Sequence, residues 1–357
     1  MTIFTAENIY KAYNDCIKHK KNTANALKFE LNREKNIFLL LSDLKERKYK
    51  ISRHICFVVT EPTAREIFAA DFRDRIVHHI LYNETKDLFE RKFVQESYAN
   101  RDGKGTHRAV NKLRYHITRG GKDGRKLYFL KMDIKGFFRN IDKNILYKII
   151  GKIILESGKD KWWKDEILWL AKMIVFHDPT SNYIFKGGYK RRDIVPTEKS
   201  LFCGDNTKGL PIGNLTSQFF ANVYLDKLDH FVKDTLGFYR YVRYVDDFII
   251  LDEDREKLEE TIEKVNMFLS EELKLKLSPK KVFLKQASEG VDFLGYYIKP
   301  THTLVRRRVV RRFKNKMYKI GKDENGFLPV SSVSMIRSYL GHFEHAHSYN
   351  LMEKLKR

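Results

Sequence analysis

The sequence predicts a protein of the α+β class. Two runs rich in β-branched and aromatic residues, 239–245 and 248–251, are separated by a short acidic turn and indicate a β-hairpin. A further strand over residues 127–132 is followed, from about Asp142, by a stretch whose apolar residues recur at helical spacing. Strands and amphipathic helices combined in this way are typical of the α+β class.

Length and composition indicate a globular protein with a polyanionic partner. The chain has 357 residues, of which 42% are hydrophobic, so it exceeds one average domain and can bury a substantial core. Its 69 Lys and Arg against 46 Asp and Glu give a formal net charge of +23. This charge favours nucleic acid as a partner. The alternative is a basic surface that faces solvent and binds no partner.

The cysteines and apolar runs indicate a cytoplasmic protein. Cys16, Cys56 and Cys203 are odd in number, far apart and in no C-x-x-C pair, which argues for a reducing compartment and against a disulfide framework or zinc site. No apolar run reaches about 18 residues, and the first residues lack the core of a signal peptide. We therefore expect no association with a membrane.

Two adjacent acids lie in the turn of the predicted hairpin. Desolvating Asp246 and Asp247 between strands rich in Val, Ile and Phe is costly unless a cation compensates, and Mg²⁺ is the compact cation for hard oxygen ligands. The alternative is an Asp-Asp turn that faces solvent. Asp133, at the end of the strand predicted for residues 127–132, is a candidate third carboxylate.

The segment Y-V-D-D resembles motif C of the reverse transcriptases, and the strand that ends at Asp133 resembles their motif A. The resemblance implies a right-hand polymerase with palm, fingers and a small helical thumb. It also implies that Asp133, Asp246 and Asp247 hold two Mg²⁺ ions for RNA-templated DNA synthesis from dNTPs on a primer. The expected domains are an N-terminal helical extension (1–60), fingers and palm (61–300), and a basic helical thumb (301–357).

The resemblance places a second group of residues at the incoming nucleotide. Arg65 takes the place of an arginine that grips the triphosphate, and Phe138, five residues after Asp133, that of a steric gate against the ribose 2′ hydroxyl. By themselves, Arg65 would be a surface residue and Phe138 a core residue. The complete expected set is Arg65, Ile134, Phe138, Ile212 and Gln218.

The motif B loop departs from the commoner pattern of the family. Ile212 stands in place of Gln and Gln218 in place of Pro, giving I-G-N-L-T-S-Q, which resembles the reverse transcriptases of diversity-generating retroelements. That group copies a template RNA with frequent errors at adenine. The resemblance therefore implies an error-prone enzyme that works with its template RNA and a small basic accessory protein.

Further residues are expected to contact nucleic acid or the leaving group. A glycine-punctuated loop carries Arg101, Lys104 and His107, which match the template-contacting motif 2, although a plain basic hairpin is the alternative. Lys281 matches the lysine of motif D and could protonate the leaving pyrophosphate, a role that Lys280 could also fill. Primer and duplex contacts are expected from Phe293, Leu294, Gly295, Arg307 and Arg311.

The sequence is also compatible with other functions. The chain could be a reverse transcriptase of the retron, group II intron or antiphage-defence type. A catalytically inactive RNA-binding scaffold on the same fold is a further alternative, against which the intact Asp133, Asp246 and Asp247 argue.

Overall fold

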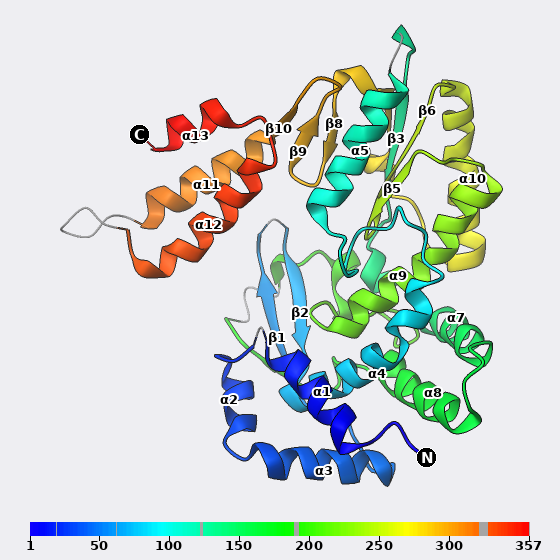
Figure 1. Ribbon diagram of the computed structural model, residues 1–357, viewed down its shortest axis with the longest axis vertical. Coiled ribbons are helices and arrows are strands. Elements are labelled where there is room, and N and C mark those ends of the chain that lie inside the picture. Colours follow the sequence, from blue (N-terminus) through cyan, green and yellow to red (C-terminus); the bar gives the residue numbers. More distant parts are fainter. Residues whose placement is uncertain (19, 62, 122–123, 189–192, 321–327, 357) are drawn as a thin grey trace. The chain divides into compact units, whose positions relative to one another are not determined.

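The computed structural model describes residues 1–18, 20–61, 63–121, 124–188, 193–320 and 328–356 (Figure 1). These residues form two compact units. The first comprises Met1–Val94, Ile134–His230 and Asn266–Lys276, and the second comprises Gln95–Asp133, Phe231–Val265 and Leu277–Arg357. Both units combine helices with β-sheet, which confirms the predicted α+β class.

The first unit carries a small sheet of strand order β2-β1-β4, in which β1 pairs antiparallel with β2 and parallel with β4. Within residues 1–60 the structure has helices α1, α2 and α3, and also β1, which the sequence analysis did not predict. Alternating burial along β1 explains this strand, because every second side chain faces the core. The elements of the unit are α1 (Ala6–Ile17), α2 (Ala24–Glu30), α3 (Arg33–Lys45), β1 (His54–Val59), β2 (Arg65–Ala69), α4 (Phe72–Glu90), α6 (Phe137–Asn140), α7 (Lys143–Leu155), α8 (Lys161–Phe176), β4 (Tyr183–Phe185) and α9 (Leu215–His230).

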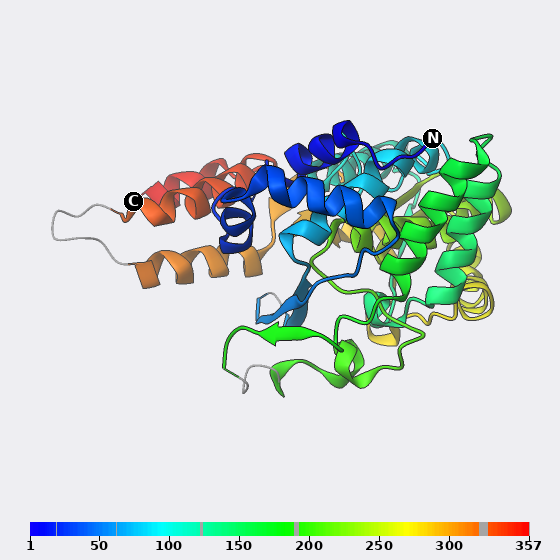
Figure 2. The ribbon, with the colours of Figure 1, turned by 90° about the horizontal axis from the view of Figure 1, so that it is seen from below.

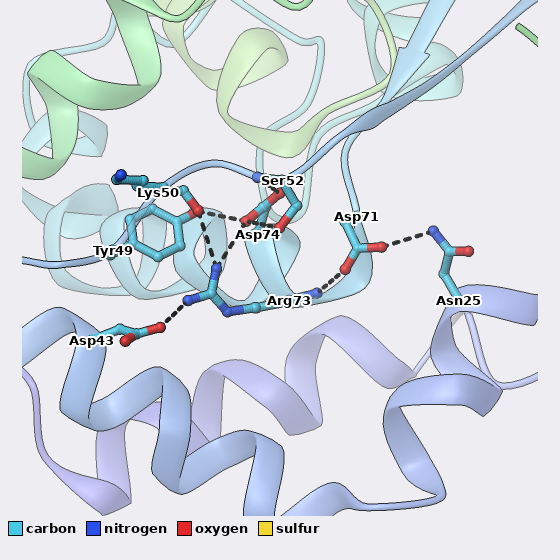
Figure 3. Close-up of polar contacts among 8 residues, drawn as sticks. All are labelled: Asn25, Asp43, Tyr49, Lys50, Ser52, Asp71, Arg73 and Asp74. Atoms are coloured by element: carbon cyan, nitrogen blue, oxygen red, sulfur yellow. Dashed lines mark hydrogen bonds and ion pairs between the residues drawn. The ribbon is translucent and has the colours of Figure 1, made fainter. Parts of the chain in front are cut away.

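A polar network joins the N-terminal helices to α4 (Figure 3). Arg73 of α4 pairs with Asp43 of α3 and donates to the Lys50 carbonyl at 3.1 Å. The fully buried Asp74 accepts hydrogen bonds from the Tyr49 hydroxyl at 2.8 Å and the Ser52 amide at 2.9 Å. Burial raises the pKa of Asp74 to about 6. The network fixes residues 43–52 on the first turn of α4.

The middle of the chain carries α7, the helix predicted from about Asp142, followed by α8 and α9. Asp142 caps α7, since its side chain accepts hydrogen bonds from the amides of Asn144 and Ile145. Helix α8 lies beside α7 (Figure 2). On α9, Phe220, Tyr224 and Leu228 are buried, and Phe219 adds edge-to-face contacts with Tyr82 and Phe89, whose ring centroids lie 5.2 Å away.

The second unit is built on a four-stranded sheet of order β5-β6-β3-β7, in which all neighbouring pairs are antiparallel. Strand β3 begins and ends one residue later than predicted. Helix α5 packs on this sheet, with Val110, Leu113 and Ile117 in the core (Figure 1). The elements are α5 (Thr106–Gly120), β3 (Tyr128–Asp133), a π-helical turn (Phe231–Thr235), β5 (Tyr241–Tyr244), β6 (Asp247–Asp252), α10 (Arg255–Leu273), which ends in the first unit, and β7 (Phe283–Gln286).

The C-terminal part of the second unit adds a three-stranded sheet and a group of helices. Strands β8 (Val291–Phe293), β9 (Tyr296–Ile298) and β10 (Thr303–Val305) form an antiparallel sheet of order β10-β9-β8. Helices α11 (Arg307–Ile320) and α12 (Val330–Glu344) lie side by side, with the Phe313 ring 5.1 Å from that of Tyr339 and 5.5 Å from that of Phe343 (Figure 1). Helix α13 (Tyr349–Lys356) follows.

Candidate active site

The three predicted carboxylates lie at one end of the four-stranded sheet. Asp133 is the last residue of β3, and Asp247, the first residue of β6, is its antiparallel partner. Asp246 lies in the turn between β5 and β6, next to Asp247. The sheet register therefore brings together residues that are more than a hundred positions apart in the chain.

The turn that carries Asp246 has a strained backbone held by a buried arginine. Val245 has φ of 57°, a left-handed conformation that is a genuine outlier for a β-branched residue. Arg243, which is 0% exposed, donates from Nη1 to the Val245 carbonyl at 3.1 Å and from Nη2 to Ser97 Oγ at 3.0 Å. Its backbone amide also donates to the Glu96 carbonyl at 2.9 Å. Arg243 thus ties the hairpin turn to residues 96–97.

Two lysines pair with the carboxylates. Lys281 Nζ lies 2.8 Å from each carboxylate oxygen of Asp133, and Lys131 Nζ lies 3.0 Å from Asp247 Oδ2. The two lysines differ in accessibility, since the side chain of Lys281 is 57% exposed and that of Lys131 is 16% exposed. Each ammonium offsets part of the negative charge of the cluster.

The pair in the hairpin is short of positive charge. Burial raises the pKa of Asp246 to about 6, and the nearby charge of Asp133 adds to the increase. Burial also raises the pKa of Asp247 to about 6, although Lys131 acts in the opposite direction. Asp247 Oδ1 is buried and has no hydrogen-bond partner. In the described part of the chain no three His, Cys, Asp or Glu side chains are arranged as a metal site. The unpartnered oxygen and the acidic donor set nevertheless fit a hard divalent cation.

The residues expected at the nucleotide lie in the first unit. Arg65 is exposed at the start of β2, and Ile134, which directly follows Asp133 in the chain, is 1% exposed. Phe138 is half-buried, with its ring 5.3 Å from that of Phe137. Ile212 and Gln218 are also half-buried.

The motif B loop is bonded to two of the segments that carry these residues. The Phe68 amide of β2 donates to the Ile212 carbonyl at 2.9 Å, and the Leu210 amide donates to the Phe138 carbonyl at 2.8 Å. The buried Asn214 side chain bridges the Ala70 amide and the Phe68 carbonyl at 3.0 and 3.1 Å. The loop that carries Ile212 is therefore hydrogen-bonded through its backbone to the segment that carries Phe138.

Glycine is required in this loop for two reasons. Gly213 has φ of 118°, and a Cβ atom there would lie 2.7 Å from Ile67 Cγ2. The loop can approach β2 only because position 213 has no side chain.

The three residues predicted to contact the template engage other parts of the second unit. Arg101 is 8% exposed and donates to the Ser97 carbonyl at 3.0 Å. Lys104 Nζ donates to the Gln95 carbonyl at 2.8 Å. The His107 ring stacks on His345, with 3.5 Å between ring centroids. The sequence did not predict that Arg101 is buried, because it lies in a basic, glycine-rich segment.

Three of the residues predicted to contact primer or duplex lie at the β8–β9 hairpin, Phe293 at the end of β8 and Leu294 and Gly295 in the turn. Phe293 is fully buried in the core under the sheet, whereas Leu294 and Gly295 are half-buried in the turn. Both turn residues have positive φ, 49° for Leu294 and 90° for Gly295. Leu294 and Gly295, rather than the Phe293 side chain, are therefore the accessible part of this motif.

Arg307 and Arg311 are exposed on one face of α11. They line a groove of about 520 Å³ together with Lys314 and apolar side chains of β10 and α13. Cationic side chains at i and i+4 on one helix face are suited to contacts with a phosphate backbone.

Sequence reasoning did not single out Lys131, Arg243 or Asn214. The available signal was a charged residue inside an apolar strand, as in L-K-M for Lys131 and V-R-Y for Arg243. Such a residue needs a partner, but its sequence neighbourhood does not say which. Lys131 and Arg243 each have a partner more than a hundred positions away in the chain.

The fold, with three carboxylates at one end of an antiparallel sheet, is of the right-hand polymerase class. The chain belongs to the reverse transcriptase (RNA-dependent DNA polymerase) family, whose profile matches residues 61–298.

The chain is similar at low identity to proteins encoded by introns. It is 21% identical over 319 residues to the putative COX1/OXI3 intron 2 protein of Saccharomyces cerevisiae, covering 73% of this chain and 34% of that protein. It is 21% identical over 331 residues to the group II intron-encoded protein LtrA of Lactococcus lactis subsp. cremoris, covering 74% of this chain and 50% of that protein. The chain thus spans half or less of the length of these relatives.

A solved structure shares the fold. Apo telomerase from Candida Tropicalis, truncated from its C-terminal domain, matches with a TM-score of 0.51 and 13% identity, covering 71% of this chain and 55% of that chain. At this identity the likeness shows the fold alone, and it confirms the predicted right-hand polymerase. None of the helices in the described residues has the length and apolar character needed to cross a membrane.

Proposed function

We propose that the protein is an error-prone reverse transcriptase that copies the template RNA of a diversity-generating retroelement into mutated cDNA. The observation that carries the proposal is the motif B loop, where Ile212 stands in place of the commoner Gln. The hydrogen bond between the Phe68 amide and the Ile212 carbonyl sets the position of residue 212 through the backbone. The identity of its side chain is therefore free to affect nucleotide selection without affecting this bond.

The proposed chemistry is transfer of a nucleotide from a dNTP to a primer 3′ hydroxyl. Asp133, Asp246 and Asp247 would hold two Mg²⁺ ions, which supply activation of the hydroxyl and neutralisation of the leaving pyrophosphate. Lys281 is the proposed acid for pyrophosphate. Since its side chain is 57% exposed, it can leave Asp133 at little desolvation cost.

A first experiment tests the carboxylates. We expect Asp246→Asn combined with Asp247→Asn to abolish Mg²⁺-dependent dNTP incorporation and to leave RNA affinity nearly unchanged, because affinity comes from Lys and Arg contacts with phosphate. Primer extension and filter binding measure the two quantities. Incorporation at the wild-type rate by the double variant would refute the assignment.

A second experiment tests the error-prone character. A glutamine at position 212 can hydrogen-bond the incoming nucleotide, whereas isoleucine cannot, and one such bond corresponds to about a tenfold change in discrimination. We expect Ile212→Gln to lower misincorporation opposite template adenine by about tenfold, as measured by sequencing cDNA copied from one defined RNA. Ile184→Gln, the same change at an exposed position of β4, is the matched control and should leave the error rate unchanged.

The similarity to group II intron-encoded proteins favours one alternative, a bacterial reverse transcriptase of ordinary accuracy. Wild-type cDNA that is already accurate at adenines would support it and refute the error-prone proposal. We further propose that the enzyme works in the cytoplasm, where its free thiols stay reduced, with a small basic accessory protein. Site-specific cDNA made efficiently by the purified enzyme from arbitrary RNA would contradict the need for that partner.

A further inference from the structure

Lys131 is a mostly buried cation next to the carboxylates, and the reverse transcriptase motifs do not account for it. It lies in β3 two residues before Asp133, so both side chains are on the same face of the sheet. Its side chain is only 16% exposed. A buried ammonium group needs hydrogen-bond partners, and those of Lys131 come from two different strands.

The first partner is the carboxylate of Asp247. Lys131 Nζ lies 3.0 Å from Asp247 Oδ2, whereas Asp247 Oδ1 is buried without a partner. Because one oxygen is held, rotation of the carboxylate about its χ2 bond is restricted. Lys131 therefore determines which way the free oxygen of Asp247 faces.

The second partner belongs to the β8–β9 hairpin. Lys131 Nζ donates to the backbone carbonyl of Asp292 at 2.7 Å and lies 5.7 Å from the centroid of the Phe293 ring. The side chain of Asp292 in turn pairs with Arg306 at 2.7 Å, and the Arg306 amide donates to the Gly295 carbonyl at 2.9 Å. Arg306 directly precedes α11. The ammonium group of Lys131 is thus hydrogen-bonded to both Asp247 and the β8–β9 hairpin. The hairpin is in turn bonded to Arg306, at the start of α11.

We propose that Lys131 is a positioning residue that couples the orientation of Asp247 to the β8–β9 hairpin. Displacement of the hairpin moves the Asp292 carbonyl, and with it the ammonium group that orients Asp247. The proposal rests on the proposed function for its link to catalysis, because that function assigns Asp247 to metal binding. Lys281 offers a contrast, since both of its bonds go to Asp133 and its side chain is mostly exposed.

Hydrogen–deuterium exchange of the full-length protein tests the coupling without any catalysis. We expect Lys131→Met to speed exchange by about tenfold in both residues 244–248 and residues 291–298, since charge-assisted bonds are lost to both segments. Lys131→Arg, which keeps the charge, should restore most of the protection. Lys281→Met should leave residues 291–298 at the wild-type rate. Faster exchange in only one segment, or in neither, overturns the proposal.

A second variant approaches the coupling from the hairpin and does not depend on the folding of Lys131→Met. Asp292→Asn removes the ion pair with Arg306 at a partly exposed position and keeps the backbone carbonyl. We expect faster exchange in residues 244–248 as well as in residues 291–298. A change confined to the hairpin contradicts the coupling.

Single-nucleotide addition then tests the consequence for catalysis. We expect Lys131→Met to lower kcat by about tenfold, because Asp247 is no longer held in one orientation, and Lys131→Arg to restore most of the rate. Lys264→Met, which removes an exposed lysine of α10, is the control expected to match the wild type. An unchanged kcat in a variant with altered exchange overturns the positioning role. If the wild type incorporates no dNTP, the proposed function fails, whereas the exchange data still decide the coupling.

Discussion

Replacing Arg243 with methionine tests how the turn that carries Asp246 is held. The substitution approximately keeps the volume and removes the hydrogen bonds of a charged donor, among them those to the Val245 carbonyl and to Ser97 Oγ. Hydrogen bonds of this kind contribute about 1.5–3 kcal/mol each. Because Arg243 is 0% exposed, water cannot easily replace it. We expect the free energy of unfolding to fall by about 3 kcal/mol.

The same substitution should affect catalysis more than stability alone explains. The left-handed conformation of Val245 stores about 1–3 kcal/mol of strain, which the bond from Arg243 helps to hold. Once that bond is lost the turn can relax and displace Asp246, and a displacement of about 1 Å can reduce a rate by about a hundredfold. We therefore expect a fall of about a hundredfold in single-turnover dNTP addition by folded Arg243→Met protein.

Urea unfolding followed by circular dichroism measures the stability change, and rapid-quench primer extension measures the rate. Arg240→Met is a matched control, because Arg240 pairs with the partly exposed Glu253 and should contribute at most about 1 kcal/mol. In the Arg243→Met background, Val245→Gly should gain about 1 kcal/mol less stability than in the wild type, since the turn has already relaxed. A wild-type rate in Arg243→Met, or an equal loss in Arg240→Met, would refute the reasoning.

Two further predictions concern the first unit. Burial lowers the pKa of His54 to about 4 and that of His78 to about 3, so below the unfolded value of 6.5 the unfolded chain binds protons that the folded chain does not. The contribution of these two histidines to stability should therefore be complete above pH 6.5 and shrink as the pH drops toward 4, and His54→Gln should reduce the slope of stability against pH by about 1.4 kcal/mol per pH unit, as measured by urea midpoints. Gly213→Ala should cost about 1–3 kcal/mol and raise KM for dNTP, because its Cβ would meet Ile67 at a positive φ. Gly151→Ala in α7, with no atom closer than 4.0 Å to the new Cβ, should instead stabilise the protein by about 0.5–1 kcal/mol.

Elements with a strong local pattern could be predicted from the sequence. The apolar spacing after Asp142 indicated α7, and the aromatic and β-branched runs around Asp246 and Asp247 indicated the hairpin. The order of the motifs then placed Asp133 beside that hairpin, and the register of β3 with β6 confirms this adjacency. Strand β1 was not predicted, because an isolated run of six residues acquires its strand character from pairing with β2 and β4.

The accessibility of basic residues could not be predicted, because a cation has the same appearance in the sequence whether it is solvated or buried. Arg101 and Arg307 both lie in basic segments, yet Arg101 is 8% exposed and bonded to the Ser97 carbonyl, whereas Arg307 lies exposed on α11. The difference in exposure arises from tertiary packing, which a local sequence does not specify. A local charge pattern therefore predicts a partner of opposite charge for the protein as a whole, but not the residues that contact it.

The carboxylates are held in place by side chains whose partners come from distant segments of the chain. Sequence motifs therefore do not identify these side chains. Lys131 is bonded to a carbonyl 161 positions away, and Arg243 to a hydroxyl 146 positions away. In both cases a charged side chain interrupts an apolar strand, which is costly unless a partner is supplied. The cost shows that some partner must exist, and only the packing of the sheet identifies it. The carboxylates can therefore be recognised from sequence, whereas the residues that orient them emerge only when strand register and helix packing are known.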